Sequence, residues 1–306
     1  MTEKKKVYHK FQTESNNYHP MRDLPVVNPL PSGVYEFIYD WDSQRGWFKQ
    51  IDTNHDKLVD LPSKEFDEVV GEIGLFLDKE TKNNYEKYGF LYKRSMLLYG
   101  QPGTGKTCIV NKVAEIVKQN GGIVLFNPRP NLLSIAYEYL NDIQPDVLTL
   151  VVFEELDQLL DQDEETMLHI LDGEIQKKNV VYLATTNFID EIPQRICRPG
   201  RFSKLISVDF PNKEARKVYL ETKLNETDRR KFNIKEWVAK TENLSIDELK
   251  ETVLSVCCLN QKLDAVVERI LATKEIQGKL IESKARGRRD RDEISAVRAM
   301  KAFYNQ

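Results

Sequence analysis

The segment at residues 100–107 has the residue types that hold phosphate groups. In its sequence, GQPGTGKT, four residues separate Gly100 from a Gly-Lys-Thr run, which is the spacing of a phosphate-binding loop. Glycines let the backbone wrap a phosphate closely, the lysine reaches the β- and γ-phosphates, and the threonine hydroxyl ligates Mg²⁺. An ATP or GTP site is therefore predicted. Its expected contacts are Gly100, Pro102, Gly103, Thr104, Gly105, Lys106, Thr107 and Cys108.

A pair of carboxylates follows an apolar segment further along the chain. Glu154 and Glu155 come directly after LTLVVF at residues 148–153, a sequence typical of a buried strand. Ligands of open α/β sheets bind at the carboxyl ends of the strands. We therefore expect Glu154 to hold Mg²⁺ and Glu155 to polarise the attacking water, with Asp157 in support. The alternative is a solvated loop after the strand.

One polar side chain follows the next expected strand. Asn187 comes after the apolar run at residues 180–184 and two threonines. At the tip of a neighbouring strand, its amide could orient the attacking water or touch the γ-phosphate. An Asn after a strand is more often a turn residue, so this prediction depends on the phosphate loop and the acidic pair.

Two arginines lie further on, in RPGRF at residues 198–202. Arginine suits phosphates because its planar fork donates two parallel hydrogen bonds and stays charged. Supplied by a neighbouring subunit, such an arginine raises turnover by roughly 10³–10⁵. Arg198 and Arg201 are therefore candidate catalytic residues, and a surface salt-bridge cluster is the alternative.

These residues need a sheet to position them, and the sequence around them predicts one. Short apolar strands alternate with helices, which indicates a parallel sheet covered on both faces. The expected strands are 96–99, 123–126, 148–153, 180–184 and 205–208. The expected helices are 106–118, 131–141 and 164–176, preceded by an amphipathic helix at 63–78. After residue 212 the pattern is all-helical, over 212–224, 233–240, 246–258 and 260–285.

The organisation of the whole chain follows from these patterns. Aromatic and β-branched residues at 34–39 and 47–51 flank a turn-rich segment and predict a β-hairpin. The polar, proline-dotted residues before it predict an extended arm. The expected parts are an arm with hairpin (1–54), an α/β nucleotide-binding domain (55–210), a small helical lid (211–275) and a charged helical tail (276–306).

Charge and composition narrow the class of protein. The 306 residues carry a net charge of -3, which does not demand nucleic acid as a partner. The basic charges of the tail leave open a solvated helix or a contact with nucleic acid or a partner. Four cysteines without a Cys-x-x-Cys pair fit a reducing cytosol. No secretory signal or membrane-spanning run is expected, which favours a soluble, cytoplasmic protein.

The order of the motifs is informative as a set. GQPGTGKT, VVFEELD, ATTN and RPGRF follow one another in this order and together resemble the AAA ATPase family of AAA+ proteins. The resemblance covers about residues 55–272, and the segments DLP at 60–62 and KYG at 87–89 add to it. It implies an α/β P-loop NTPase fold, a doubly wound parallel sheet with a helical lid. It also implies Mg²⁺-dependent hydrolysis of ATP bound between the two.

Carried over position by position, the resemblance gives most of the site residues a role. Lys106 and Thr107 match the phosphate and metal ligands. Glu154 and Glu155 match the acidic pair, although the first acid of the family is usually Asp. The match upstream of the first strand adds Asp60 to the predicted nucleotide contacts.

The remaining matches imply an assembly. Asn187 matches the family's strand-tip sensor, and Arg198 and Arg201 match its two arginine fingers. If these arginines act in a neighbour's site, the protein forms a homo-oligomeric ring, and a hexamer is the family habit. A head-to-tail interface that closes produces such a ring.

One departure concerns the loop after the second strand. Family unfoldases carry an aromatic residue followed by Gly there, facing a central pore. Here Tyr137 and Tyr139 are present without that Gly, and their spacing also fits the buried stripe of a helix. The short loop resembles the branch with the mitochondrial inner-membrane chaperone that moves folded Rieske protein, without the membrane anchor of that branch.

The main functional prediction is an ATP-hydrolysing ring that remodels or translocates a protein substrate. Two alternatives stay open. The basic tail would suit a nucleic-acid motor or loader. The Glu-first acidic pair would suit a nucleotide-gated scaffold with slow turnover.

Overall fold

The structure is a computed structural model that describes residues 9–14, 17–25, 29–51, 59–172 and 177–276. The chain divides into two compact units, Met1–Val218 and Tyr219–Gln306. The first unit contains the sheet and the second is helical. The charged tail predicted at 276–306 lies, apart from its first residue, outside the described residues.

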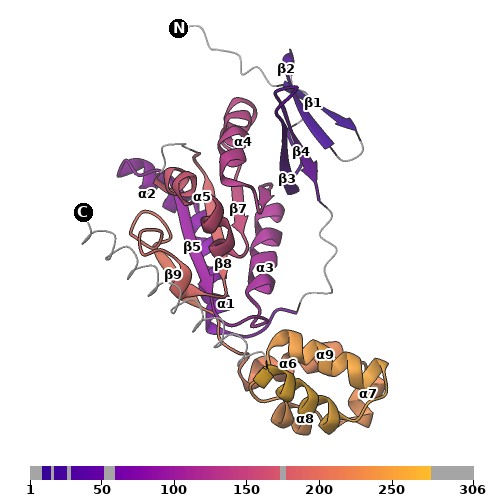
Figure 1. Ribbon diagram of the computed structural model, residues 1–306. Helices are drawn as coiled ribbons and strands as arrows, with labels where there is room; N and C mark the ends of the chain where they lie inside the picture. The colour runs from indigo at the N-terminus through magenta and orange to yellow at the C-terminus, as the bar shows by residue number, and fades with distance from the viewer. Residues whose placement is uncertain (1–8, 15–16, 26–28, 52–58, 173–176, 277–306) are drawn as a thin grey trace, which may run out of the picture. The chain divides into compact units, whose positions relative to one another are not determined.

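The first unit is built on one sheet, which in the described residues has nine strands (Figure 1). The strands are β1 (His9–Glu14), β2 (Asn17–Pro25), β3 (Gly33–Asp40), β4 (Arg45–Gln50), β5 (Lys93–Tyr99), β6 (Ile123–Phe126), β7 (Thr149–Phe153), β8 (Val180–Thr186) and β9 (Lys204–Ser207). Their order is β1-β2-β4-β3-β6-β7-β8-β5-β9. All neighbours from β3 to β9 in this order are parallel. The predicted α/β fold with a mostly parallel sheet is confirmed.

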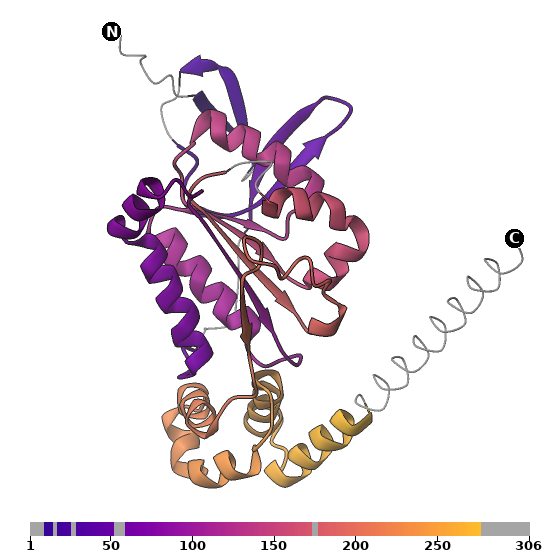
Figure 2. The ribbon, with the colours of Figure 1, turned by 90° about the vertical axis from the view of Figure 1, so that its left-hand side faces the viewer.

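Helices cover both faces of the sheet. Apolar side chains of α1 (Lys64–Leu77) and α3 (Lys106–Gln119) pack on one face, and those of α4 (Pro130–Ile143) and α5 (Leu156–Asp172) pack on the other. Figure 2 shows α1 and α3 on one side of the strands and α5 on the opposite side. In β5, Leu97 contributes to one core while Met96 and Leu98 contribute to the other. Successive side chains of a strand point to opposite faces, so a strand buried on both is apolar throughout.

Three helices differ from the sequence predictions. One is α7 (Glu226–Lys231), which was not predicted and buries no residue. The helix α2 (Lys79–Lys87) was not predicted because it buries no residue and so lacks an apolar stripe; the Asp78 carboxylate caps its first turn. In α5 the backbone is non-helical at Asp163, whose carboxylate accepts a hydrogen bond from the Thr166 N–H. The helix predicted to begin at residue 164 therefore corresponds to the part of α5 after this kink.

The predicted hairpin forms, and it belongs to the central sheet. The strands β3 and β4 pair as an antiparallel hairpin, and residues 33–35 of β3 pair in parallel with residues 123–125 of β6. The ring of Phe37 packs 5.8 Å from that of Tyr139 in α4. The residues expected to form an extended arm include β1 and β2, which extend the sheet further. Residue types and the turn-rich segment predicted the hairpin, but they did not predict that β3 would pair with β6.

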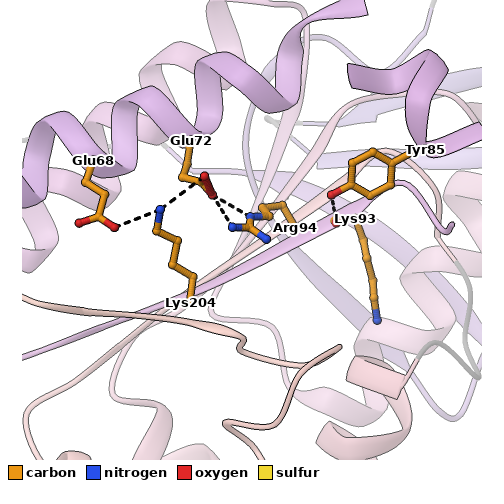
Figure 3. A network of polar contacts seen from close by, with 6 residues as sticks. All are labelled: Glu68, Glu72, Tyr85, Lys93, Arg94 and Lys204. Atoms are coloured by element: carbon orange, nitrogen blue, oxygen red, sulfur yellow. Dashed lines mark hydrogen bonds and ion pairs between the residues drawn. The ribbon is translucent and has the colours of Figure 1, made fainter. Parts of the chain in front are cut away.

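Ion pairs connect α1 to β5 and β9, on the side of the sheet away from the hairpin (Figure 3). Arg94 of β5 donates to the Glu72 carboxylate of α1 at 2.8 and 2.5 Å. Lys204 of β9 lies 3.0 Å from Glu68 and 3.4 Å from Glu72. The helix α1 thus contacts both β5 and β9, the last strand in the sheet order.

The second unit is all-helical where it is described, as predicted. Its elements are the end of α6 (Lys213–Lys223), α7 (Glu226–Lys231), α8 (Ile234–Lys240), α9 (Ile246–Val253), a π-helical turn at Leu254–Cys258 and a helix over residues 263–276. The large side chain of Trp237 is buried. A capping box at Ser245 begins α9. Within the described part of the chain, no helix has both the length and the apolar character needed to cross a membrane.

Candidate active site

The loop between β5 and α3 has a backbone that requires glycine. Gly100 has φ +153°, and a Cβ there would lie 2.2 Å from the carbonyl oxygen of Val208. Gly105, with φ +107°, caps α3 and offers no side-chain acceptor to the first-turn N–H groups. These N–H groups, together with the positive end of the helix dipole, suit an anion. The local geometry is that of a phosphate-binding loop.

Lys106 lies across this loop. Its side chain is buried, and its Nζ donates to the carbonyl oxygens of Gly100 and Gln101 at 2.8 Å each. The hydroxyl of Thr104 donates to the same Gln101 carbonyl at 3.0 Å. A phosphate oxygen is a stronger, charged acceptor than these neutral carbonyls. The ammonium group is thus held where a bound phosphate would attract it.

The strand register brings the predicted acidic pair and sensor to the same edge. β8 lies between β7 and β5, with Ala184 opposite Phe153 and Thr186 opposite Tyr99. Glu154 and Asn187 are the residues that follow β7 and β8, and Gly100 follows β5. The structure therefore places these residues at the carboxyl ends of three neighbouring strands.

Glu154 has a carboxylate oxygen that the described chain does not satisfy. Its Oε1 is buried and has no hydrogen-bond partner among the described residues. Burying such an oxygen without a partner is costly. Mg²⁺ and its water shell prefer oxygen ligands of this kind. With the exposed hydroxyl of Thr107 at the start of α3, the donor set fits the predicted Mg²⁺.

Glu155 adopts an unusual backbone conformation at the beginning of α5. Its φ is +53°, in the left-handed region that non-glycine residues rarely enter. Such strain clusters at functional sites. The exposed carboxylate accepts a hydrogen bond of 2.6 Å from the Gln158 amide. Sequence reasoning missed Gln158, although a spacing of three residues at a helix start was a usable signal.

Asp157 supports the end of β8. Its carboxylate accepts a hydrogen bond of 2.6 Å from the Thr186 hydroxyl, which itself accepts from the Phe188 N–H at 3.0 Å. These bonds hold the backbone on both sides of Asn187. The supporting role expected for Asp157 is therefore directed at the sensor strand.

Asp60 lies beside α3. Its carboxylate pairs with Lys112 at 2.8 Å, and this hydrogen bond raises the pKa of Lys112. Lys112 is six residues after Lys106, or about 9 Å along the helix axis. The contact of Asp60 with a nucleotide stays a prediction.

The candidate arginine fingers lie at the amino ends of the parallel strands. We call these ends the amino edge of the sheet and the opposite ends the carboxyl edge. Arg201 makes two bonds of 2.6 Å to Asp172 and a third to the Arg195 carbonyl. These bonds lower the pKa of the Asp172 carboxyl. Lys93, the first residue of β5, donates to the carbonyl of Leu171 next to this pair.

The distance between the two edges separates these arginines from the loop. β5 has seven residues, which corresponds to about 23 Å. Arg201 at one end of β5 therefore cannot reach the phosphate loop of its own chain at the other end. Arg198 lies nearby in sequence and is exposed. Sequence reasoning missed Asp172, because its separation of 29 residues from Arg201 leaves no local signal.

The tyrosines of α4 belong to the buried stripe of the helix. Tyr137 is fully buried, its hydroxyl bonds to that of Tyr182 at 3.0 Å, and burial raises its pKa. Tyr139 packs against the same core. Of the two interpretations of these residues, the helical stripe is confirmed.

Comparisons with known proteins agree with this geometry. Residues 96–210 match the family model AAA, "ATPase family associated with various cellular activities". ATPase family AAA domain-containing protein 2 of Homo sapiens is 27% identical over 197 residues, 56% of this chain and 13% of that protein. The Cell division cycle protein 48 homolog of Archaeoglobus fulgidus is 30% identical over 158 residues, 45% of this chain and 21% of that protein. The Vesicular-fusion protein SEC18 of Saccharomyces cerevisiae is 27% identical over 202 residues, 56% and 27% of the two chains.

Each of these matches covers only a small part of the relative. This chain spans between 13% and 27% of the length of these three relatives, so they describe a domain. The matched segment contains the phosphate loop, the acidic pair, Asn187 and both arginines. Residues 96–210 of this chain are therefore an AAA ATPase domain.

Proposed function

We propose that this protein hydrolyses Mg-ATP as a cytoplasmic homo-oligomeric ring, a hexamer, and uses the reaction to remodel or translocate a protein substrate. The observation that carries the proposal is the carboxyl edge of the sheet. There, Lys106 lies across a loop of positive-φ glycines, and Glu154 carries a buried oxygen without a partner among the described residues.

The residues of this edge divide the reaction among them. The loop N–H groups and Lys106 bind the phosphates. Thr107 and Glu154 would hold Mg²⁺, which would supply positive charge to the phosphate groups. Glu155 accepts a proton from the water that attacks the γ-phosphorus. Asn187 orients that water. The bond to the bridging oxygen breaks, and ADP and phosphate leave.

The arginines support a ring. Arg201 lies beside the start of β5, and this strand is about 23 Å long, so a catalytic role for Arg201 and for the nearby Arg198 requires a second copy. A head-to-tail contact places the amino edge of one sheet against the carboxyl edge of the next, and repetition of that contact closes a ring. Each site is then completed by its neighbour.

A macromolecular substrate is favoured by the names of two relatives and by charge. These relatives are named for vesicular fusion and for the cell division cycle, not for a metabolite. The net charge of -3 gives no general attraction to nucleic acid. Tyr137 lies in the core and Tyr139 packs against it, so we expect other residues to contact the substrate.

Steady-state hydrolysis and substrate trapping test the proposal. Lys106→Ala should lose nucleotide binding, measured by titration with a fluorescent ATP analogue. Glu155→Gln should keep binding, lose turnover and retain substrate in a pull-down with ATP. The exposed acid Glu165 of α5 supplies the control, and Glu165→Gln should behave as wild type.

Two results would contradict the proposal. Tight ATP binding by Lys106→Ala would show that the loop is not the nucleotide site. A Glu155→Gln pull-down that returns only the protein itself would argue against remodelling.

A further inference from the structure

We propose that Tyr88 and Phe90 form the apolar anchor of the interface between neighbouring copies of this chain, docking on the carboxyl edge of the next copy. The inference rests on the ring in the proposed function and identifies the surface that builds it. We call Tyr88 and Phe90 the amino-edge patch.

The two aromatic side chains are held out into solvent by an ordered turn. Tyr88 is 65% exposed and Phe90 69%, the highest values among large apolar side chains in the described part of the chain. The Tyr88 N–H donates to Asn84 at 3.0 Å and the Phe90 N–H to Tyr85 at 2.9 Å. Contiguous exposed apolar groups mark interaction surfaces, and these two aromatic residues are separated by one glycine.

The aromatic pair and the arginines share one edge of the sheet. Phe90 is three residues before Lys93, a distance of at most about 10 Å. Lys93 donates to Leu171, next to the Asp172 that holds Arg201. Figure 3 shows the Tyr85 hydroxyl of α2 at the Lys93 carbonyl, 3.4 Å away, which fixes the turn to the start of β5. A partner that receives an arginine from this edge therefore meets the aromatic pair as well.

The opposite edge of the same molecule complements this patch. It carries the acids Glu154 and Glu155, and bound nucleotide adds further negative charge there, whereas the amino edge presents the exposed Arg198. Phe188, directly after Asn187, supplies an apolar side chain that is 42% exposed. Opposite charge at opposite edges steers identical copies into head-to-tail contact. A second copy of this chain is therefore the occupant that the surface fits.

Aromatic anchors of this kind dominate the binding energy of interfaces, while the surrounding polar contacts contribute little. The double variant Tyr88→Ser/Phe90→Ser should lower the association constant at least roughly 30-fold, as for one dominant anchor. Both side chains are exposed, so the thermal unfolding midpoint should stay near that of wild type.

Sedimentation velocity with Mg²⁺ and a non-hydrolysable ATP analogue tests this expectation. The matched control is Trp41→Ser, because Trp41 is 64% exposed and lies at the tip of the hairpin, away from the patch. Wild type and Trp41→Ser should sediment as rings and the double variant as monomers. Equal assembly of the double variant, or equal loss by Trp41→Ser, would overturn the inference.

A mixing experiment tests the direction of the contact. Phe188→Ser should weaken the other side of the same interface, so neither variant alone assembles. Mixed, the two retain one intact pair of surfaces and should form a heterodimer but no ring. A mixture that stays monomeric would overturn the head-to-tail assignment.

A failure of the proposed interface can be distinguished from a failure of the proposed ATPase function. ATP turnover of the wild type is measured in parallel. A ring that hydrolyses ATP but is insensitive to the double variant would overturn the interface alone. A monomer that hydrolyses ATP would overturn the ring and this interface, and a ring without turnover would overturn the ATPase.

Discussion

Polar groups at the carboxyl and amino edges of the parallel sheet differ in whether the chain itself supplies their hydrogen-bond partners. At the carboxyl edge, Glu154 Oε1 has no partner among the described residues, and the N-cap Gly105 offers no side-chain acceptor. At the amino edge, two arginines are paired within the chain: Arg201 with Asp172 and Arg195 with Glu164. Buried polar groups are normally hydrogen-bonded, and the unpartnered oxygen at the carboxyl edge is why we propose the ligand site there.

Two buried lysines repeat this contrast. Lys106 at the carboxyl edge lies between two loop carbonyls, on a backbone shaped for phosphate. Lys177 at the amino edge is 1% exposed and donates to the Pro145 carbonyl at 2.7 Å. Burial lowers the pKa of Lys177 to about 8. The same residue type is thus a proposed phosphate ligand at one edge and a structural donor at the other.

The largest expected effect concerns the arginines of the amino edge. Arg201→Ala should lower turnover by at least roughly 10³-fold, as loss of a finger supplied in trans, while ATP affinity stays near wild type. Arg195→Ala is the control, because Arg195 makes a comparable pair with Glu164 at the same edge. It should hydrolyse ATP near the wild-type rate. Normal turnover by Arg201→Ala would mean that both pairs at this edge are only structural.

The next effect concerns the backbone of the carboxyl edge. Gly100→Ala should lower the free energy of unfolding by about 3 kcal/mol, because the new Cβ would lie 2.2 Å from the Val208 carbonyl oxygen. Gly121 precedes β6 at the other edge with φ +73° and open space around it. Gly121→Ala should cost only about 1 kcal/mol, the penalty for φ alone. Equal losses in urea unfolding would remove the argument for a close approach at Gly100.

The smallest effect is a pH dependence from Lys177. Its pKa is lowered from 10.5 to about 8 in the folded protein, so the unfolded state binds more protons between these values. Stability therefore rises with pH in that window. Between pH 7 and 9.5, wild type should gain about 2 kcal/mol relative to Lys177→Met.

Urea unfolding at both pH values measures this difference, with Lys178→Met, a change at an exposed neighbour, as the control. Lys178→Met should follow the wild-type pH dependence. If Lys177→Met follows it too, the ammonium group of Lys177 is not desolvated. The contrast between the two edges would then depend on the paired arginines alone.

Much of the fold could be predicted because its signals are local. The phosphate loop, the strand at Ile123–Phe126 and the helix after the loop follow from glycine positions and apolar period. The misses share a cause, because their partners are distant or their surfaces polar. The helix α2 buries nothing, and the expected arm contains β1 and β2, whose pairing no short pattern encodes.

The site shows the same division. Sequence spacing predicted Lys106 from the Gly-rich loop before it, and Glu154 and Glu155 from the apolar strand that they follow. It could not identify Asp172, which meets Arg201 only through the fold. Nor could it give Glu155 its left-handed backbone, which depends on how α5 begins against the end of β8.

The sequence by itself determined which residue types are available: a Gly-rich loop with a lysine, two carboxylates after an apolar strand, and two arginines in RPGRF. Only the tertiary structure decided where these groups meet. Placing β8 between β7 and β5 puts Asn187 between the acidic pair and the loop. Placing Arg201 beside the start of β5 removes it from its own site. Residue types and spacing act over a few residues, whereas strand order is decided by contacts between segments far apart in the chain.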